Sequence, residues 1–269
     1  MRQIKFKNII RHFHNRRNFN KINWLKTLVI NIFLLPFNIA RKLPIFIYGK
    51  CELGVLSGDV IFLEPPYKGM LKIGITDPFR SVESTSFIQI QGTFELGKQV
   101  VLRRGIHMHI AGLLRLEDHV YIGDNNSICA GNQIRIGTGT RVGNNTTFID
   151  TDFHYIVNIQ NNSIKNNTSP VEIGAQNWIG GNCIIKKGTK TPKGTIIAGP
   201  YSMTSKDYTQ IIEEYSLIAG SPAKILIKNV RRVNNIQSEK VLYEHFKNTT
   251  EQYIVSPDEF ETFCLPTND

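Results

Sequence analysis

The sequence lacks the usual marks of an exported or membrane-spanning protein. Its four cysteines, Cys51, Cys129, Cys183 and Cys264, are scattered without a CxxC pair, and no signal peptide is recognisable. Such thiols are expected to stay reduced in a cytoplasmic protein. An uncharged stretch over residues 27–40 is too short to cross a bilayer, because a spanning helix needs about 20 residues. We therefore expect a cytoplasmic protein.

Acidic residues are also in the minority, with 22 Asp and Glu against 32 Lys and Arg, for a net charge of +10. This balance favours an anionic partner such as phosphate, a nucleotide or a membrane surface. No segment rich in Pro, Gly or Ser marks a second globular domain. The 269 residues are therefore expected to form one large domain with appendages. We expect no nucleic-acid partner.

The sequence does contain a repeat with a step of about six residues. The repeating positions are Ile90, Leu96, Leu102, Met108, Leu114, Leu116, Ile122, Ile128, Ile136, Val142, Phe148, Ile173, Ile179, Ile185, Thr191, Ile197 and Met203. Two slips of two residues reset the register at Leu116 and Ile136, and a short residue such as Gly97 or Gly143 often follows. This hexapeptide pattern predicts a parallel β-helix, in which three repeats close one triangular coil. The alternative, a β-sandwich, alternates with period two and needs no sixfold register.

The repeat and its limits divide the chain after residue 49 into a β-helix, a loop that interrupts it, and a C-terminal segment. Residues 50–228 are predicted to form the β-helix, with irregular first coils in which Ile61, Leu71 and Ile73 are candidate inward positions. Residues 151–170 interrupt the repeats as an Asn-rich excursion loop, and long loops in compact domains are often functional. Residues 229–269 are predicted to form a C-terminal helical cap.

Residues 1–49 form a basic segment that contains an amphipathic helix. Six apolar residues share one side at helical spacing: Trp24, Leu25, Leu28, Val29, Ile32 and Phe33. Such a helix can pack on the open N-terminal end of the β-helix and cap it. It can also lie in the interface of an anionic membrane, with its basic flanks at the headgroups. The sequence leaves both interpretations open, and both can hold at once.

Three histidines in the regular repeats do not predict a metal site. His107 and His109 alternate across one strand, and His119 lies on the next stretch. Left-handed β-helix carbonic anhydrases bind zinc with three histidines, two of them five residues apart, and no HxxxxH occurs here. We expect these side chains to face solvent or a neighbouring subunit, and we expect no metal.

Four motifs give the sequence a specific resemblance. DTDFH at the break is followed by VEIGAQNWIGGNCIIKKGT, then by IAGPYSMTSKD and IAGSPAKIL. In this order the motifs resemble those of the hexapeptide-repeat acyltransferases, most closely the O-acetyltransferases of bacterial surface-polysaccharide biosynthesis. The resemblance covers residues 90–228. It implies a left-handed parallel β-helix, acetyl-CoA as co-substrate, and a homotrimer with the coenzyme between adjacent subunits.

The resemblance assigns His154 of DTDFH as the catalytic base. It would take the proton of an acceptor hydroxyl as that oxygen attacks the thioester of acetyl-CoA, and a histidine suits this task near neutral pH. Asp150 or Asp152 is expected to hold the other ring nitrogen, although a backbone carbonyl would also serve. The polar residues about one coil earlier are candidates for holding the acceptor sugar: Asp124, Asn125, Asn126 and Asn132.

The coenzyme contacts are implied by the resemblance alone. Trp178, Gly181, Gly199 and Thr204 match positions that line the thioester and the pantetheine arm. Lys206, Lys224 and Lys228 are candidates for the coenzyme phosphates, with an ordinary solvated surface as the alternative. Trp178 needs cover from a subunit, a ligand or the excursion loop. The chain departs from the family at Pro200-Tyr201 and in the long segment 207–217.

Three functions fit the sequence. The first is an acetyl-CoA-dependent O-acetyltransferase that acts on a sugar hydroxyl of a surface polysaccharide or its lipid-linked precursor. The second is the same chemistry on another small acceptor, such as a sugar-nucleotide amine or a xenobiotic. The third is a non-catalytic β-helix module, which DTDFH disfavours. The basic N-terminus favours the first function, with the enzyme peripheral at the inner face of the membrane.

Overall fold

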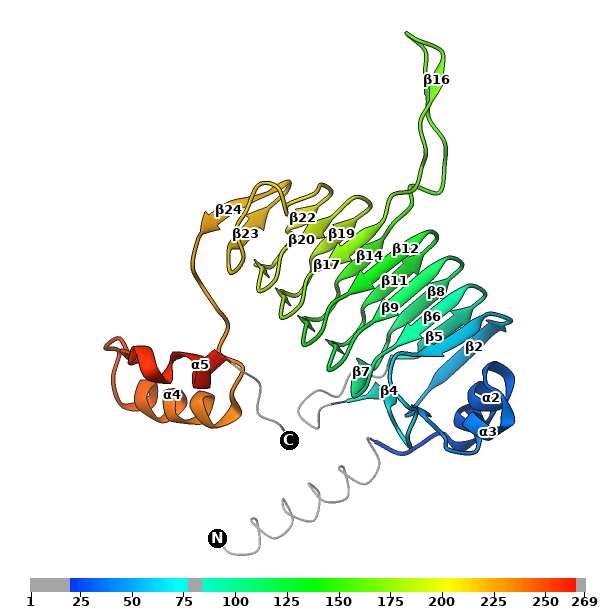
Figure 1. Ribbon diagram of the computed structural model, residues 1–269, viewed down its shortest axis with the longest axis horizontal. Coiled ribbons are helices and arrows are strands. Elements are labelled where there is room, and N and C mark those ends of the chain that lie inside the picture. The colour runs from blue at the N-terminus through cyan, green and yellow to red at the C-terminus, as the bar shows by residue number, and fades with distance from the viewer. Residues whose placement is uncertain (1–19, 77–83, 265–269) are drawn as a thin grey trace, which may run out of the picture.

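The computed structural model, which describes residues 20–76 and 84–264, shows a parallel β-helix built from three sheets (Figure 1). Sheet I contains β1 (Ile45–Ile47), β4 (Leu71–Ile75), β7 (Val100–Arg103), β10 (Tyr121–Ile122), β13 (Arg141–Val142), β18 (Trp178–Ile179), β21 (Ile196–Ile197), β23 (Leu217–Gly220) and β24 (Ala223–Ile227). Sheet II contains β2 (Cys51–Leu56), β5 (Ser86–Ile90), β8 (His107–Ile110), β11 (Ser127–Ala130), β14 (Thr147–Ile149), β19 (Ile184–Lys186) and β22 (Met203–Thr204). Sheet III contains β3 (Asp59–Phe62), β6 (Thr93–Leu96), β9 (Leu113–Leu116), β12 (Gln133–Ile136), β17 (Val171–Ile173) and β20 (Lys190–Thr191). The chain passes through sheets I, II and III in turn.

The register of the strands explains the two slips in the sixfold repeat. Leu102 pairs with Ile122, and Ile122 with Val142, so each of these coils contains 20 residues. The additional residues lie in sheet III, where both Leu114 and Leu116 of β9 point inward. Three repeats of six plus a slip of two therefore describe one coil.

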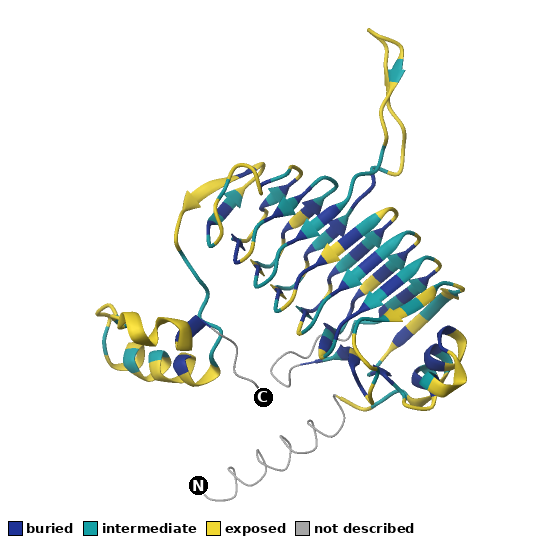
Figure 2. Cartoon of the chain, in the orientation of Figure 1, coloured by how far each residue is buried: buried dark blue, intermediate teal, exposed yellow. Residues whose placement is uncertain are grey.

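The predicted inward positions form one continuous core along the coil axis (Figure 2). Phe94 and Phe148 are its largest apolar side chains without solvent exposure, and burying each such residue contributes about 1.5–3 kcal/mol. Leu71 is buried as predicted, whereas Ile61 is 48% exposed, so its inward assignment is wrong. The assignment of Met203 is also wrong, because Thr204 occupies the buried position of β22.

A helix closes the N-terminal edge of sheet I. In α2 (Trp24–Leu34), the buried Asn31 amide donates to the Ile45 carbonyl at 2.7 Å and accepts from the Ile45 N–H at 3.2 Å. The Thr27 hydroxyl oxygen accepts from the Ile47 N–H at 3.0 Å. These side chains satisfy the unpaired edge of β1, which an open sheet would leave free. The short α3 (Phe37–Ala40) follows.

The face of α2 that packs on the coil is therefore not the apolar face that the sequence indicated. Leu25, Leu28, Ile32 and Phe33 point away from the coil and are between 44% and 71% exposed. Trp24 is 52% exposed, and its ring packs edge-on against the Phe46 ring of β1. Within residues 20–76 and 84–264, no helix is long and apolar enough to cross a membrane. The helix thus closes the coil and also exposes an apolar surface.

The break in the repeats forms a hairpin that projects from the coil (Figure 1). Its strands β15 (Val157–Asn158) and β16 (Ser163–Ile164) pair antiparallel, and Thr151 bridges Thr168 at its base.

The C-terminal helices form a separate unit beside the coil. These are α4 (Ile236–Asn248), the 3-10 turn η1 (Pro257–Glu259) and α5 (Phe260–Cys264). Figure 1 shows them set apart from β23 and β24, so they do not cover the last coil as a cap would. Arg231 holds the unit in place, because its guanidinium pairs with Glu261 and lies over the Tyr215 ring.

Candidate active site

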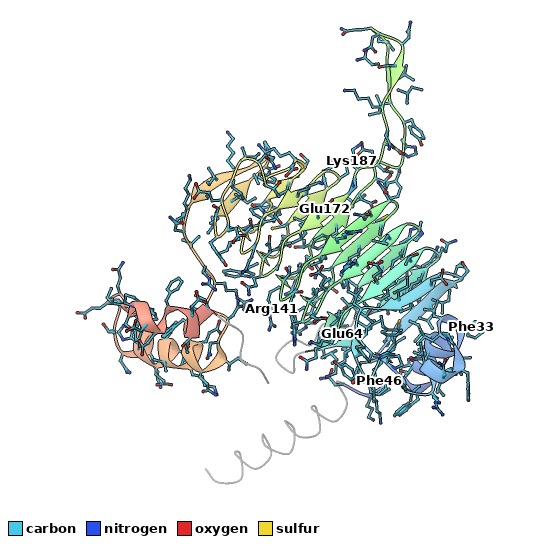
Figure 3. The ribbon with its side chains drawn as sticks, in the orientation of Figure 1. Phe33, Phe46, Glu64, Arg141, Glu172 and Lys187 are labelled. Atoms are coloured by element: carbon cyan, nitrogen blue, oxygen red, sulfur yellow. The ribbon has the colours of Figure 1, made fainter. Side chains whose placement is uncertain are left out.

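His154 lies in a cleft of about 300 Å³ at the base of the hairpin. Asp152 and Lys187 line the same cleft, together with hairpin residues such as Lys165 and Asn167. The Lys187 ammonium lies 2.6 Å from the Asp152 carboxylate and donates to the Asn167 carbonyl at 3.2 Å. Lys187 therefore ties both strands of the hairpin base to the following coil (Figure 3). Sequence reasoning missed this residue, although it belongs to the quoted IIKKGT motif.

The backbone at DTDFH turns sharply and exposes the histidine. Phe153 adopts a left-handed conformation with φ of 60°, and its N–H donates to the Thr151 hydroxyl at 3.0 Å. The His154 N–H donates to the Asp152 carbonyl at 2.7 Å. This turn leaves the imidazole exposed in the cleft, with no hydrogen bond from its ring to any residue of the described chain. The ring is thus accessible to an incoming hydroxyl.

Asp150 does not hold the histidine, so that candidate role is wrong. Its side chain is fully buried, and its two oxygens accept from the backbone N–H groups of Gly131 at 2.8 Å and Asn132 at 2.9 Å. It therefore joins two successive coils where the hairpin leaves the β-helix. The Asp152 carboxylate is held by Lys187, and neither carboxylate contacts the His154 ring.

The acceptor candidates do not form one group. Asn132 is exposed near the hairpin base, where its amide lies 3.5 Å from the Thr168 hydroxyl. Asp124 lies at another corner of the coil and pairs with Arg103 at 2.9 Å. Asn125, with φ of 55°, forms the adjacent turn.

Asn126 is an internal structural residue, so its assignment to substrate binding is wrong. Its side chain is fully buried, and its amide donates to the carbonyls of Gly123 at 2.8 Å and Gly143 at 2.9 Å. Its oxygen accepts from the Thr146 N–H at 2.8 Å. These bonds satisfy backbone groups at the turn and leave nothing for a ligand.

Trp178 is 42% exposed on the outer surface of sheet I. Its cover does not come from the excursion loop, because the Arg232 guanidinium lies 5.3 Å from the ring centroid. Arg232 belongs to the segment that connects β24 to α4. The sequence offered no signal for this contact, since the two residues are far apart along the chain.

The predicted glycines stack at one corner of the coil. A Cβ at Gly199 would overlap the Gly181 carbonyl oxygen, so the close approach of successive coils accounts for glycine at this position. Both residues keep backbone groups at the surface. The Thr204 side chain instead points into the core and hydrogen-bonds Thr189 at 3.1 Å, and the whole residue has no solvent exposure, so it offers no surface to a ligand.

The lysine candidates lie on the last coils. Lys206 stacks over the Tyr208 ring at 5.3 Å, and Lys224 is exposed on β24. Lys228 pairs with Glu213 at 3.0 Å. Two of the three ammonium groups are thus free of acidic partners within the described residues.

The histidine and the glycine corner lie on opposite borders of sheet II. His154 follows β14 and precedes β17, at the border of sheets II and III. Gly181 and Gly199 follow β18 and β21, at the border of sheets I and II. A single chain therefore does not bring the predicted base and the predicted coenzyme positions together.

Comparisons with known proteins support the fold. No protein-family model matches the sequence. The structure of the polysialic-acid-specific acetyltransferase NeuO is similar, with a TM-score of 0.50 and 19% identity over 79% of this chain and 91% of that chain. The polysialic acid O-acetyltransferase OatWY also matches, with a TM-score of 0.41 and 16% identity over 80% of this chain and 98% of that chain. At these identities the likeness concerns the fold.

The chain is thus a mainly β protein with the left-handed parallel β-helix fold of the hexapeptide-repeat acyltransferases, as its sequence predicted.

Proposed function

We propose that the protein is an acetyl-CoA-dependent O-acetyltransferase that acetylates a sugar hydroxyl of a surface polysaccharide or its precursor. The observation that carries this proposal is the exposed His154 ring in the cleft at the hairpin base, with no hydrogen-bond partner for the ring among the described residues. An unpartnered imidazole can accept a proton directly from an acceptor. The fold shared with known acetyltransferases agrees with this chemistry.

The proposed reaction is a direct transfer. The acceptor oxygen attacks the thioester carbonyl while His154 takes its proton, the new C–O bond forms, and the C–S bond breaks. The coenzyme leaves as a thiolate that receives the proton from the imidazolium, which restores the base. Lys187 and Asp152 act as positioning residues, because their ion pair fixes the turn that presents His154.

We further propose that the active enzyme is a homotrimer in which one subunit supplies His154 and its neighbour supplies Trp178, Gly181 and Gly199. The separation of these residues across sheet II supports an intersubunit site. The projecting hairpin supports it as well, because Ile156 and Ile159 are 74% and 86% exposed on that arm. Apolar side chains on a projecting arm favour burial against another chain.

Mixed trimers test this arrangement. His154→Ala and Trp178→Ala subunits are each expected to be nearly inactive alone. Random mixing should restore activity in about a quarter of the sites, where an intact His154 meets an intact Trp178. Absence of recovery in trimers of verified mixed composition would place both residues in one chain's site.

The exposed apolar surface of α2 supports a peripheral location of the protein on the cytoplasmic side of an anionic membrane. Its exposed apolar side chains include Phe33 (Figure 3) and continue to Phe37, which is 84% exposed. The sequence of α2, WLKTLVINIFL, carries no acidic residue. Lys26, Arg41 and Lys42 flank this surface. Apolar insertion combined with basic flanks is the pattern of interfacial helices.

Vesicle flotation tests the location. The protein should float with phosphatidylglycerol vesicles, and Phe33→Ser with Phe37→Ser should abolish flotation. Ile254→Ser, which changes an apolar residue of the C-terminal segment that is 80% exposed, is the matched control and should float. Equal flotation of all variants would contradict this proposal.

The main experiment follows release of the CoA thiol with a panel of sugar acceptors. His154→Gln should lower the acceptor-dependent rate by about 10²-fold or more, as expected for loss of a general base. His107→Gln, which changes an exposed histidine on β8, should keep the wild-type rate. Equal rates in both variants would remove His154 as the base.

A further inference from the structure

Trp178 neighbours two arginines that come from different parts of the chain. Arg141 on β13 is its strand partner on the outer surface of sheet I, and Arg232 lies over its ring at 5.3 Å. The Arg141 guanidinium in turn lies 5.2 Å from the Tyr121 ring centroid on the preceding coil. Figure 3 shows Arg141 on the side of the coil that faces the C-terminal helices.

Neither arginine has an anionic partner in the part of the chain that the structure describes. Nearby Arg103, in contrast, pairs with Asp124 at 2.9 Å, and Arg231 pairs with Glu261. Burial lowers the pKa of Arg232, the charge of Arg141 lowers it further, and Glu239 opposes both. Glu239 is exposed, so solvent screens its charge.

A cleft of about 290 Å³ lies beside Arg141, and Arg232 lies next to it in the chain segment that includes Asn234. Arg141, Tyr121, His119 and Gln176 line it from the coil, and Asn234 closes it from the C-terminal segment. Its lining thus combines a cation, an aromatic ring and uncharged groups that both donate and accept hydrogen bonds. This combination suits a polar ring that carries a negative group.

We propose that Arg141 and Arg232 bind the oxyanion of an acidic saccharide, a carboxylate or a phosphate, beside Trp178. The planar guanidinium presents paired donors that match either oxyanion. The ring of Trp178 offers a flat apolar surface on which a sugar ring can pack. The proposal rests on the proposed function and specifies it, because it makes the acceptor an acidic saccharide.

Arg141 and Trp178 lie on earlier coils than the lysines proposed to contact the coenzyme phosphates. Arg141 lies one coil before Trp178, toward the N-terminus, whereas Lys206 and Lys224 lie on later coils. In the proposed trimer, Trp178 faces the neighbour's His154, so a saccharide held by Arg141 would present its hydroxyl groups near the base.

Tryptophan fluorescence gives a direct binding test. The chain has two tryptophans, so Trp24→Phe leaves Trp178 as the only one in the full-length protein. The probes are a sialic acid oligomer for the carboxylate, glucose 1-phosphate for the phosphate, and maltose as the neutral comparison. The acidic probe that fits should change the fluorescence saturably, and maltose should not.

Substitutions then assign the binding. Arg141→Gln and Arg232→Gln should each weaken binding by about tenfold or more, as expected for lost hydrogen bonds to a charged group. Arg141→Lys and Arg232→Lys should bind the acidic probe with affinities between those of the wild type and the glutamine variants, since lysine keeps the charge but loses the paired donors. Arg135→Gln, on the exposed surface of sheet III, is the control and should bind normally.

Two results would overturn the site. One is binding of maltose as tight as that of the acidic probes. The other is loss of CoA affinity, with saccharide affinity unchanged, in the arginine variants, which would make the pair a coenzyme contact. The fluorescence assay measures binding without turnover, so it tests this site independently of the proposed transferase activity. A protein that has no transferase activity but binds acidic saccharides through these arginines would support the site and contradict the proposed function.

Discussion

Asp150 and Asp152 lie two residues apart at the start of the hairpin, yet their alanine variants are expected to fail in opposite ways. The two oxygens of Asp150 accept from the backbone N–H groups of Gly131 and Asn132. A hydrogen bond to a charged group contributes about 1.5–3 kcal/mol. The two N–H groups lie in exposed residues and regain water when the carboxylate is removed, so we expect Asp150→Ala to lower the free energy of unfolding by about 2–4 kcal/mol.

Asp152→Ala is expected to keep nearly all of its stability. The side chain is partly exposed and pairs with Lys187, and such surface pairs contribute about 0–1 kcal/mol. The loss should instead affect turnover, because the pair fixes the turn before His154. Asp150→Asn should lie between Asp150→Ala and the wild type in stability, since its amide keeps one acceptor oxygen and turns a donor toward the second N–H.

Urea unfolding followed by circular dichroism measures the stability, and thiol release from acetyl-CoA measures the turnover. Wild-type stability of Asp150→Ala would refute the structural role of this carboxylate. A loss above 2 kcal/mol in Asp152→Ala would show that the ion pair contributes more than its exposure allows.

Three further predictions follow from the same contacts. Gly199→Ala should lower the urea midpoint because its Cβ would meet a carbonyl of the previous coil, whereas Gly131→Ala should not, because its Cβ would make only ordinary van der Waals contacts with Asp150 and Thr151 at 3.4 Å or more. Burial raises the pKa of Cys51 to about 12 and raises those of the other three thiols, so Ellman's reagent should react at least about tenfold more slowly with native than with urea-unfolded protein at pH 8. The hydrogen bond from Arg231 lowers the pKa of Glu261 below its ordinary value, so the pair is stabilising above the ordinary pKa and its contribution is lost as pH falls through the lowered pKa. Because the pair is exposed, limited proteolysis of the C-terminal helices should become only modestly faster there, and Glu261→Gln should remove that pH dependence.

The β-helix could be predicted from the sequence because the inward residues of its stacked coils recur at a fixed spacing. Every position of the sixfold repeat except Met203 is buried, whereas Ile61 in the irregular first coils is exposed. The slips at Leu116 and Ile136 correspond to the wider strands of sheet III. The error at Met203 comes from a local shift, since Ile185 pairs with Thr204 after a step of 19 residues. A periodic count does not detect a single added residue near the end of a coil.

The site was harder to predict because its residues are far apart in the sequence, or because the sequence does not show in which direction their side chains point. The cover of Trp178 by Arg232 links two segments with no shared pattern. The apolar face of α2 was visible, but the packing face was not, since polar Thr27 and Asn31 hold it to β1. The motif DTDFH marked the position of His154 without indicating which aspartate is buried.

Buried asparagines explain why polarity near the histidine was misleading. Asn126 and Asn177 are both almost fully buried at turns of the coil, and each donates to two backbone carbonyls. The chain bends at three corners in each coil, and at each corner some backbone carbonyl and N–H groups no longer take part in the hydrogen bonds of the β-sheets. Internal amides replace those lost partners, so asparagine here is a building residue of the corner. In a β-helix, therefore, the polar residues that indicate a ligand are the exposed and unpaired ones, such as Arg141 and His154, rather than those closest in sequence to the catalytic motif.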